Sequence, residues 1–145
     1  MKFSPTKIAA IVLVLILVPG TAKWWKRISY ESKVSKRVDA TRHSLPHSDQ
    51  PGFMQTGIEL QGHLLKSRFR TSHAFDATPE LTAAMTKAAR DSVCNDADFR
   101  EMLEHGYTFE HTFDRTPEVG GLPGTGIPLQ VATTAADCPG VSVKK

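Results

Sequence analysis

Short catalytic motifs are missing from this chain of 145 residues. It contains no G-x-S-x-G nucleophile turn, no phosphate-binding P-loop and no H-E-x-x-H zinc motif. Cysteine is scarce too, and the 2 residues present form neither a C-x-x-C redox pair nor a four-ligand zinc site. The sequence therefore indicates no enzyme class, and we expect no cofactor, no metal and no small-molecule substrate.

The N-terminal end carries the one long apolar stretch, residues 8–18, after Lys2 and Lys7. An export signal combines a positive start, an apolar core of about 7 to 15 residues and small residues before the cut, which would fall after Ala22. A membrane anchor needs about 17 to 25 residues, and 8–25 would serve if Lys23 extends to the interface. We predict residues 1–25 to be a signal anchor or a signal peptide, and favour the anchor.

The next residues suit a membrane interface. Indole rings collect at the headgroup level, which fits Trp24 and Trp25, and cations such as Lys26 and Arg27 attract anionic headgroups. We predict these four residues to lie at the interface of a lipid bilayer. Residues 26–55 are predicted to form a basic juxtamembrane stalk and linker.

Charge is divided unevenly along the chain. Residues 23–42 carry seven basic and two acidic side chains, a net +5, whereas residues 43–145 carry nine and thirteen, a net −4. No aromatic platform is interleaved with the basic residues, so we expect no nucleic-acid partner.

The sequence carries conflicting signals about the side of the membrane on which the body lies. The basic flank after the apolar stretch favours a cytoplasmic body, whereas the signal-like start and the cysteine usage favour export. We predict a single-pass inner-membrane protein with its body in the periplasm; the alternative is a cleaved periplasmic protein.

Turn-forming residues from His43 to Gly52 predict a linker. A strand is expected around Ile58 to Arg70, with a bulge near Gly62. Thr78, followed by proline and glutamate, predicts the start of a helix. A second short helix is expected after residues 95–98, which interrupt the first, and Gly106 is expected to end it.

The clearest strand is Tyr107 to Asp114, where apolar and polar residues alternate strictly. A last strand containing Leu129 and Val131 should lie at a sheet edge, because Pro128 cannot donate to a ladder. The glycine-rich loop before it precedes a strand and so lacks the helix dipole of a phosphate cradle. We interpret Gly120, Gly121 and Gly124 as a flexible contact surface.

These patterns predict an α+β protein: an N-terminal membrane helix, then a small antiparallel sheet of about three strands packed on one or two helices. The folded domain is expected over residues 56–140. Cys94 and Cys138 are the only available pair and should form a disulfide in an oxidising compartment. Closing this loop would contribute on the order of 4 kcal/mol of stability.

The order of Cys94, a leucine and glycine pattern ending at Gly106, an aromatic strand ending in Asp114, and Cys138 resembles a loose group of small, uncharacterised bacterial proteins. They are exported or membrane-anchored. The resemblance covers about residues 56–139 and implies a disulfide-bonded α+β body without a known activity. This chain departs from the pattern at 116–126, where a long loop replaces a tight hairpin turn, which puts the strand register in doubt.

Histidines and acids are the remaining candidates for chemistry. His43 and His47 have the i,i+4 spacing of helical metal ligands, but Pro46 between them argues against a helix. His105 should lie at a helix end and His111 in a strand, so their imidazoles should diverge. An acidic patch surrounds the second helix: Asp96, Asp98, Glu101 and Glu104. Capping and solvation explain these acids more simply than catalysis does.

The function most consistent with these features is a membrane-anchored, extracytoplasmic binding or accessory protein of a bacterial envelope, with an envelope protein as its partner and no enzymatic activity. One alternative is a small envelope hydrolase that uses His105, His111 or the acidic patch. An exclusion or immunity factor is a further alternative, which the sequence does not separate from the first.

Overall fold

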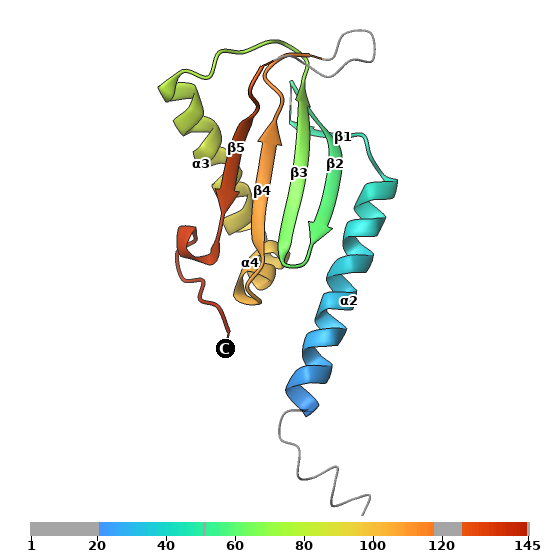
Figure 1. Ribbon diagram of the computed structural model, residues 1–145. Coiled ribbons are helices and arrows are strands. Elements are labelled where there is room, and N and C mark those ends of the chain that lie inside the picture. Colours follow the sequence, from blue (N-terminus) through green and yellow to red (C-terminus); the bar gives the residue numbers. More distant parts are fainter. Residues whose placement is uncertain (1–20, 51, 118–125, 145) are drawn as a thin grey trace, which may run out of the picture. The chain divides into compact units, whose positions relative to one another are not determined.

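A computed structural model describes residues 21–50, 52–117 and 126–144 (Figure 1). The chain divides into two compact units, Met1–Arg37 and Val38–Lys145. Helix α2 (Thr21–His43) begins in the first unit and ends in the second. The second unit contains all of the strands and the remaining helices among these residues.

Helix α2 covers the first part of the segment predicted to be a basic juxtamembrane stalk. Its last turn is basic and its first turn holds no acid. Within the described ranges, no helix combines the length and hydropathy that crossing a membrane requires. The predicted membrane helix is therefore absent from the described fold, and residues 1–20, where most of it was expected, lie outside the described residues.

The second unit is built on one mixed five-stranded sheet. Its strands are β1 (His47–Gln50), β2 (Phe53–Gln61), β3 (Leu64–Thr71), β4 (Thr108–Phe113) and β5 (Leu129–Thr133). They lie in the order β1-β2-β3-β4-β5, and every neighbouring pair is antiparallel except β3 and β4, which are parallel. The prediction of about three antiparallel strands was wrong in both number and direction.

Two local features explain the missing strands. The single strand expected around Ile58 to Arg70 is a hairpin of β2 and β3, because Gly62 has φ 59° and forms the turn where we expected a bulge. The segment interpreted as a linker contains β1, which pairs with β2. Strand β1 has the sequence HSDQ, whose polar residues give no apolar alternation to recognise.

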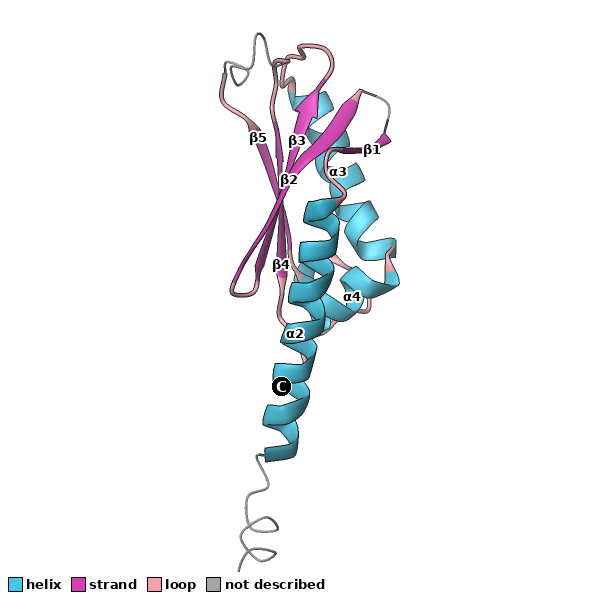
Figure 2. Cartoon of the chain, turned by 90° about the vertical axis from the view of Figure 1, so that its right-hand side faces the viewer, coloured by secondary structure: helices cyan, strands magenta, loops and turns pink. Residues whose placement is uncertain are grey.

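Parallel strands cannot be joined by a tight turn, so the chain crosses from β3 to β4 through two helices. These are α3 (Pro79–Asn95) and α4 (Ala97–Glu104). Both lie on the same face of the sheet (Figure 2). The described residues thus contain three α-helices, α2, α3 and α4.

Local capping chemistry fixes the helix boundaries as predicted. The Thr78 hydroxyl accepts a hydrogen bond from the backbone N–H of Leu81 at 3.2 Å. The Asp96 carboxylate accepts from the N–H groups of Asp98 and Phe99, at 2.9 and 3.0 Å, and starts α4. Gly106, with φ 81°, reverses the chain after α4 so that β4 can begin.

The core lies between the sheet and α3. Ala89 of α3 packs with Phe113 and Val131 of the sheet. Aromatic side chains surround this centre, and the rings of Phe53 and Phe113 meet edge to face at 5.6 Å. Phe109, near the start of β4, is buried and packs against Phe99 of α4.

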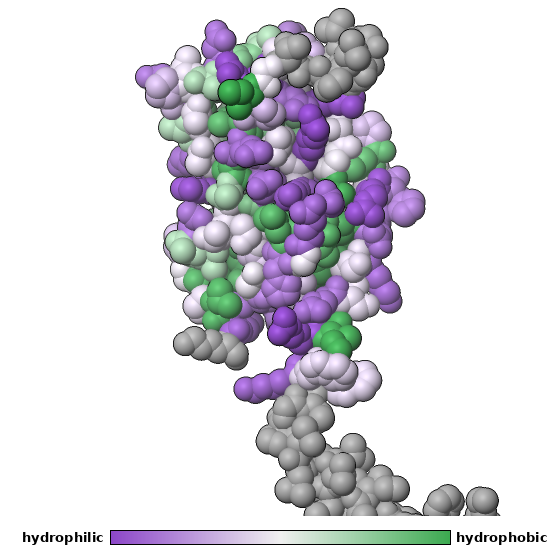
Figure 3. Space-filling model, viewed as in Figure 1, coloured by the Kyte–Doolittle hydropathy of each residue, from purple (hydrophilic) through white to green (hydrophobic). Residues whose placement is uncertain are grey.

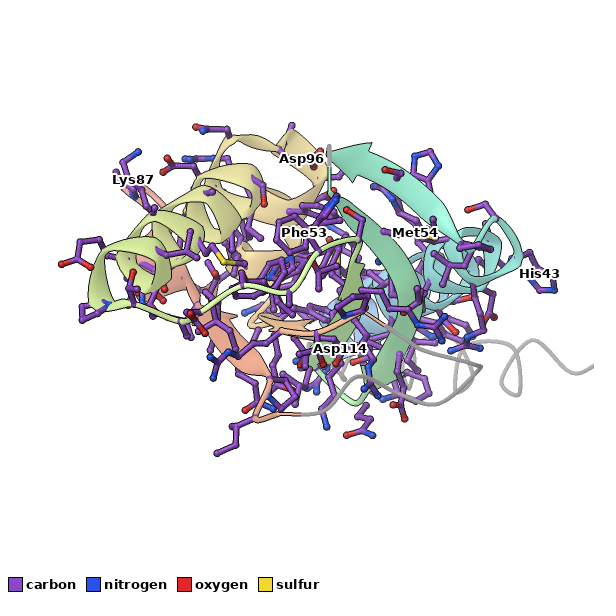
Figure 4. All side chains as sticks on the ribbon, turned by 90° about the horizontal axis from the view of Figure 1, so that it is seen from above. His43, Phe53, Met54, Lys87, Asp96 and Asp114 are labelled. Carbon is purple, nitrogen blue, oxygen red and sulfur yellow. A yellow bond between two sulfur atoms is a disulfide. The ribbon has the colours of Figure 1, made fainter. Side chains whose placement is uncertain are left out.

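The structure contains the disulfide that the sequence predicts, between Cys94 and Cys138, whose Cα atoms are 5.3 Å apart. Cys94 lies at the end of α3, and Cys138 follows the short 3-10 helix η1 (Ala135–Asp137) after β5. Its sulfur atoms are seen in yellow beside α3 (Figure 4). The bond therefore fastens the helix layer to the edge strand of the sheet.

Removing the disulfide should lower the free energy of unfolding by about 4 kcal/mol, because a loop of 44 positions would no longer be closed in the unfolded chain. We expect this loss in C94A/C138A, measured by urea unfolding. Wild-type protein with a reductant should lose the same amount, whereas the double variant should not respond to the reductant. Equal stability of the oxidised and reduced wild type would contradict the prediction.

Candidate functional site

The two faces of the sheet differ in chemistry. On the face toward α3 and α4, residues are apolar or small and mostly buried; in register across β3, β4 and β5 they include Leu65, Phe109 and Thr133. The opposite face carries polar and charged side chains. We call it the polar sheet face and define it by the outward residues Met54, Glu59, Lys66, Arg68, Arg70, Glu110, Thr112 and Gln130.

Charges on the polar sheet face alternate across the strands. Lys66 of β3 lies in register between Glu59 of β2 and Glu110 of β4, so both cross-strand neighbours of Lys66 are acidic. Figure 3, which looks onto this face, shows hydrophilic residues spread over the strands among smaller hydrophobic areas. This arrangement keeps the face close to neutral overall while giving it a defined pattern of charge.

One charge on this face is held firmly. The Arg68 guanidinium donates two hydrogen bonds to the Asp114 carboxylate, with N–O distances of 3.1 and 3.0 Å. The Asp114 side chain is 9% exposed and that of Arg68 is 54% exposed. A buried carboxylate therefore positions an arginine that solvent and a binding partner can reach, and it raises the pKa of the arginine.

Two adjacent residues of β2, Phe53 and Met54, point to opposite faces of the sheet. Phe53 belongs to the core, whereas Met54 is 44% exposed on the polar sheet face. Figure 4 shows the labelled Phe53 and Met54 on opposite sides of β2. Met54 thus adds a flexible apolar side chain to a face on which polar residues predominate.

His111 lies in the middle of β4, on the inner face of the sheet, which is the face toward α3 and α4. Its ring stacks on Phe69 at 5.7 Å and on Phe113 at 6.4 Å. Burial lowers its pKa from 6.5 to about 4, so the imidazole is neutral at physiological pH. Its Nδ1 atom is buried and makes no hydrogen bond within the described part of the chain.

The groups proposed for hydrolysis do not form one site around this imidazole. His105 caps the end of α4 through its backbone N–H, while His111 is enclosed by phenylalanines in β4. Asp96 is used as the helix cap, and Glu104 pairs with Lys144, which lowers the pKa of Glu104. Among the described residues, no three histidine, cysteine or acidic side chains are grouped as a metal site would require.

The other predicted site residues remain predictions. Trp24 and Trp25 are exposed near the start of α2, with Lys26 and Arg27 beside them. Gly120, Gly121 and Gly124 lie outside the described residues. The sequence did not predict the pairing of Arg68 with Asp114, which lie 46 residues apart in the chain.

No protein-family model matches the chain, and no curated protein matches it by sequence. Two solved structures share the fold. One is a candidate secreted protein of Pseudomonas aeruginosa, with 18% identity and a TM-score of 0.52, covering 78% of this chain and 96% of that one. The other is the pilotin of the Vibrio vulnificus type 2 secretion system, with 21% identity and a TM-score of 0.56, covering 78% and 94%.

At 18% and 21% sequence identity, the similarity to these two structures is a similarity of fold. Both neighbours are nearly covered in full, so the shared fold is that of a whole small protein. The resemblance to small exported proteins with the same cysteine pattern is a separate matter and stays a prediction.

The neutral, buried His111 should make folding sensitive to acid. The folded pKa lies below the unfolded value of 6.5, so an unfolded chain binds a proton that the folded chain excludes. Stability is fully present above pH 6.5 and should fall by about 3 kcal/mol as the pH drops toward 4. Replacing His111 with phenylalanine should remove this part of the pH dependence in urea unfolding.

The control is H73Q, which removes the imidazole of an exposed histidine outside the core, and its unfolding is compared with that of H111F over the same pH range. Carboxylates such as Glu104, whose pKa is lowered, add their own loss in more acidic solution, below the ordinary pKa of a glutamate. An unchanged slope between pH 7 and 5 in H111F would show that His111 is not the responsible group.

Proposed function

We propose that this protein is an extracytoplasmic accessory protein of a bacterial envelope that acts by binding another envelope protein and not by catalysis. The observation that carries the proposal is the fold: a disulfide-bonded body that shares its architecture with a pilotin and a candidate secreted protein. The pilotin likeness makes a component of a secretion system the first class of partner to test.

The state of the cysteines supports an extracytoplasmic body. The two thiols are joined, and both cysteines are buried in the folded protein. Disulfides persist in the periplasm and other oxidising compartments and are rare in the cytosol of mesophiles.

The chemistry of the described side chains supports binding. Asp96 caps α4, Glu104 forms an ion pair with Lys144, and the ring of His111 stacks on Phe69. The polar sheet face offers the best contact surface in the second unit. Its three cations are balanced by the acids Glu59, Glu110 and Asp114, which suits a protein segment with charges of both signs better than a polyanion.

Thiol labelling of intact cells tests the compartment. A membrane-permeant maleimide should not modify Cys94 or Cys138 in denatured extracts unless a reductant is added first, because the bond forms outside the cytosol. The C94A/C138A variant controls for labelling of other proteins. Immediate labelling of both cysteines without a reductant would place the body in the cytosol.

Photocrosslinking tests the binding surface. A photoreactive residue at Met54 or Gln130, both exposed on the polar sheet face, should give one reproducible adduct in intact cells. Lys87 is the matched control, since its side chain is 78% exposed on α3 and points away from the sheet (Figure 4). Mass spectrometry should identify an envelope protein in the adduct.

Reversing one charge on the polar sheet face provides a second test of the photocrosslinking result. E59K reverses one charge on the polar sheet face and should reduce the yield of the Met54 adduct, because it places two lysines in register across β2 and β3. Equal adducts from Lys87 and Met54, or no adduct from the polar sheet face, would exclude this face as the contact surface.

A further inference from the structure

The first half of helix α2 has two chemically distinct faces. Trp24, Trp25 and Ile28 are all exposed, with 58%, 65% and 39% of their surfaces accessible. Positions i, i+1 and i+4 lie on one side of a helix, so these three side chains form one apolar patch. We call it the tryptophan patch.

A basic stripe runs beside the tryptophan patch. Successive members are three, seven, three and one positions apart, which places all five within about 140° of the helix circumference: Lys23, Lys26, Lys33, Lys36 and Arg37. Lys36 follows Trp25 by three helical turns and therefore lies on the same line along the helix. The basic stripe and the tryptophan patch thus meet along one edge.

From these two surfaces we infer that α2 binds the anionic surface of a lipid bilayer, lying along the headgroup layer without crossing it. A helix that lies in the interface combines a lysine- and arginine-rich face with large apolar side chains on the adjoining face. Indoles favour the headgroup region, and cations are attracted to anionic lipids. This binding site goes beyond the proposed function, which concerns the second unit and a protein partner.

The details of α2 favour lipid over other partners. The rings of Trp24 and Trp25 pack edge to face at 5.6 Å, so they form one compact cluster and not the spaced platform on which successive nucleic-acid bases stack. A protein partner would favour an interface core depleted of charge. Here three apolar residues lie beside five cations, and the one acid next to the patch, Glu31, is paired with Arg27 at 3.0 Å; this arrangement matches the boundary between acyl chains and anionic headgroups.

The chain supplies its own spectroscopic probe, because Trp24 and Trp25 are the only 2 tryptophans in the sequence. Full-length protein is mixed with vesicles of phosphatidylcholine and phosphatidylglycerol in equal parts, and separately with pure phosphatidylcholine vesicles. With the anionic vesicles, tryptophan emission should shift to the blue and become protected from acrylamide. The shift should be weak with pure phosphatidylcholine and should reverse at high salt.

A charge variant tests the basic stripe. K23Q/K26Q/K36Q should lower the partition coefficient on anionic vesicles about a hundredfold, since each cation near such a surface contributes about a factor of five. The matched control, K87Q/R90Q/K144Q, removes three cations from the second unit outside the polar sheet face and should partition as the wild type does. Circular dichroism and the intact disulfide show that each variant is folded.

Several results would overturn the inference. Equal emission shifts with anionic and neutral vesicles would assign membrane binding to something other than the basic stripe. So would an unchanged partition of K23Q/K26Q/K36Q, or an equal loss in the control. A single-stranded oligonucleotide that shifts the emission and displaces the vesicles would assign α2 to nucleic acid. Failure of any of these tests leaves the photocrosslinking test of the polar sheet face unaffected.

Discussion

The parallel pairing of β3 with β4 is the constraint on which the rest of the second unit depends. Two parallel neighbours cannot be joined by a hairpin, so about 36 residues must leave the sheet between Thr71 and Thr108 and return to its other end. The sequence fills this connection with α3 and α4, and both helices cover one face of the sheet. The opposite face is thereby left for charged and polar residues.

The disulfide adds a covalent link between the helix layer and the sheet. Helix α3 packs on β5, which is an edge strand with only one neighbour in the sheet. An edge strand gains half of the ladder hydrogen bonds of a central strand and is the part of a sheet most prone to open. By joining Cys94 at the end of α3 to Cys138 after β5, the disulfide holds this edge against the helix layer.

Local signals in the sequence predicted local structure well. Thr78, Asp96 and Gly106 act through hydrogen bonds or backbone angles that involve residues at most three positions away, so reading the nearby sequence was enough to place them. Strand β4 was equally clear because its alternation is strict. The cysteine pair could be predicted as well, since two cysteines allow only one intramolecular bond.

The sheet could not be predicted in the same way, because strand pairing depends on residues far apart in the chain. The turn at Gly62 and a bulge at the same position look alike in one sequence, and only the register of β2 with β3 separates them. Strand β1 has four polar residues and forms because β2 offers it an edge. The Arg68 and Asp114 pair follows from the parallel register, which no spacing in the sequence reveals.

His111 shows what the fold requires of its inner face. A strand at the centre of a covered sheet usually presents apolar residues, and the neighbours of His111 on β4, Phe109 and Phe113, do so. The imidazole is tolerated because it is neutral and stacks as an aromatic ring between Phe69 and Phe113. The same enclosure that makes the ring acceptable in the core removes it from water, and this burial is the cause of its lowered pKa.

The division of charge along the chain gives its two parts different electrostatic fields. A net charge of +5 over residues 23–42 produces a potential that attracts anionic surfaces at a distance of about 10 Å at ordinary salt, without any need for precise contacts. The polar sheet face, with cations and acids in alternating register, produces little net potential and can discriminate only at contact distance. Long-range attraction to an anionic surface and short-range discrimination by a charge pattern therefore come from different parts of one chain.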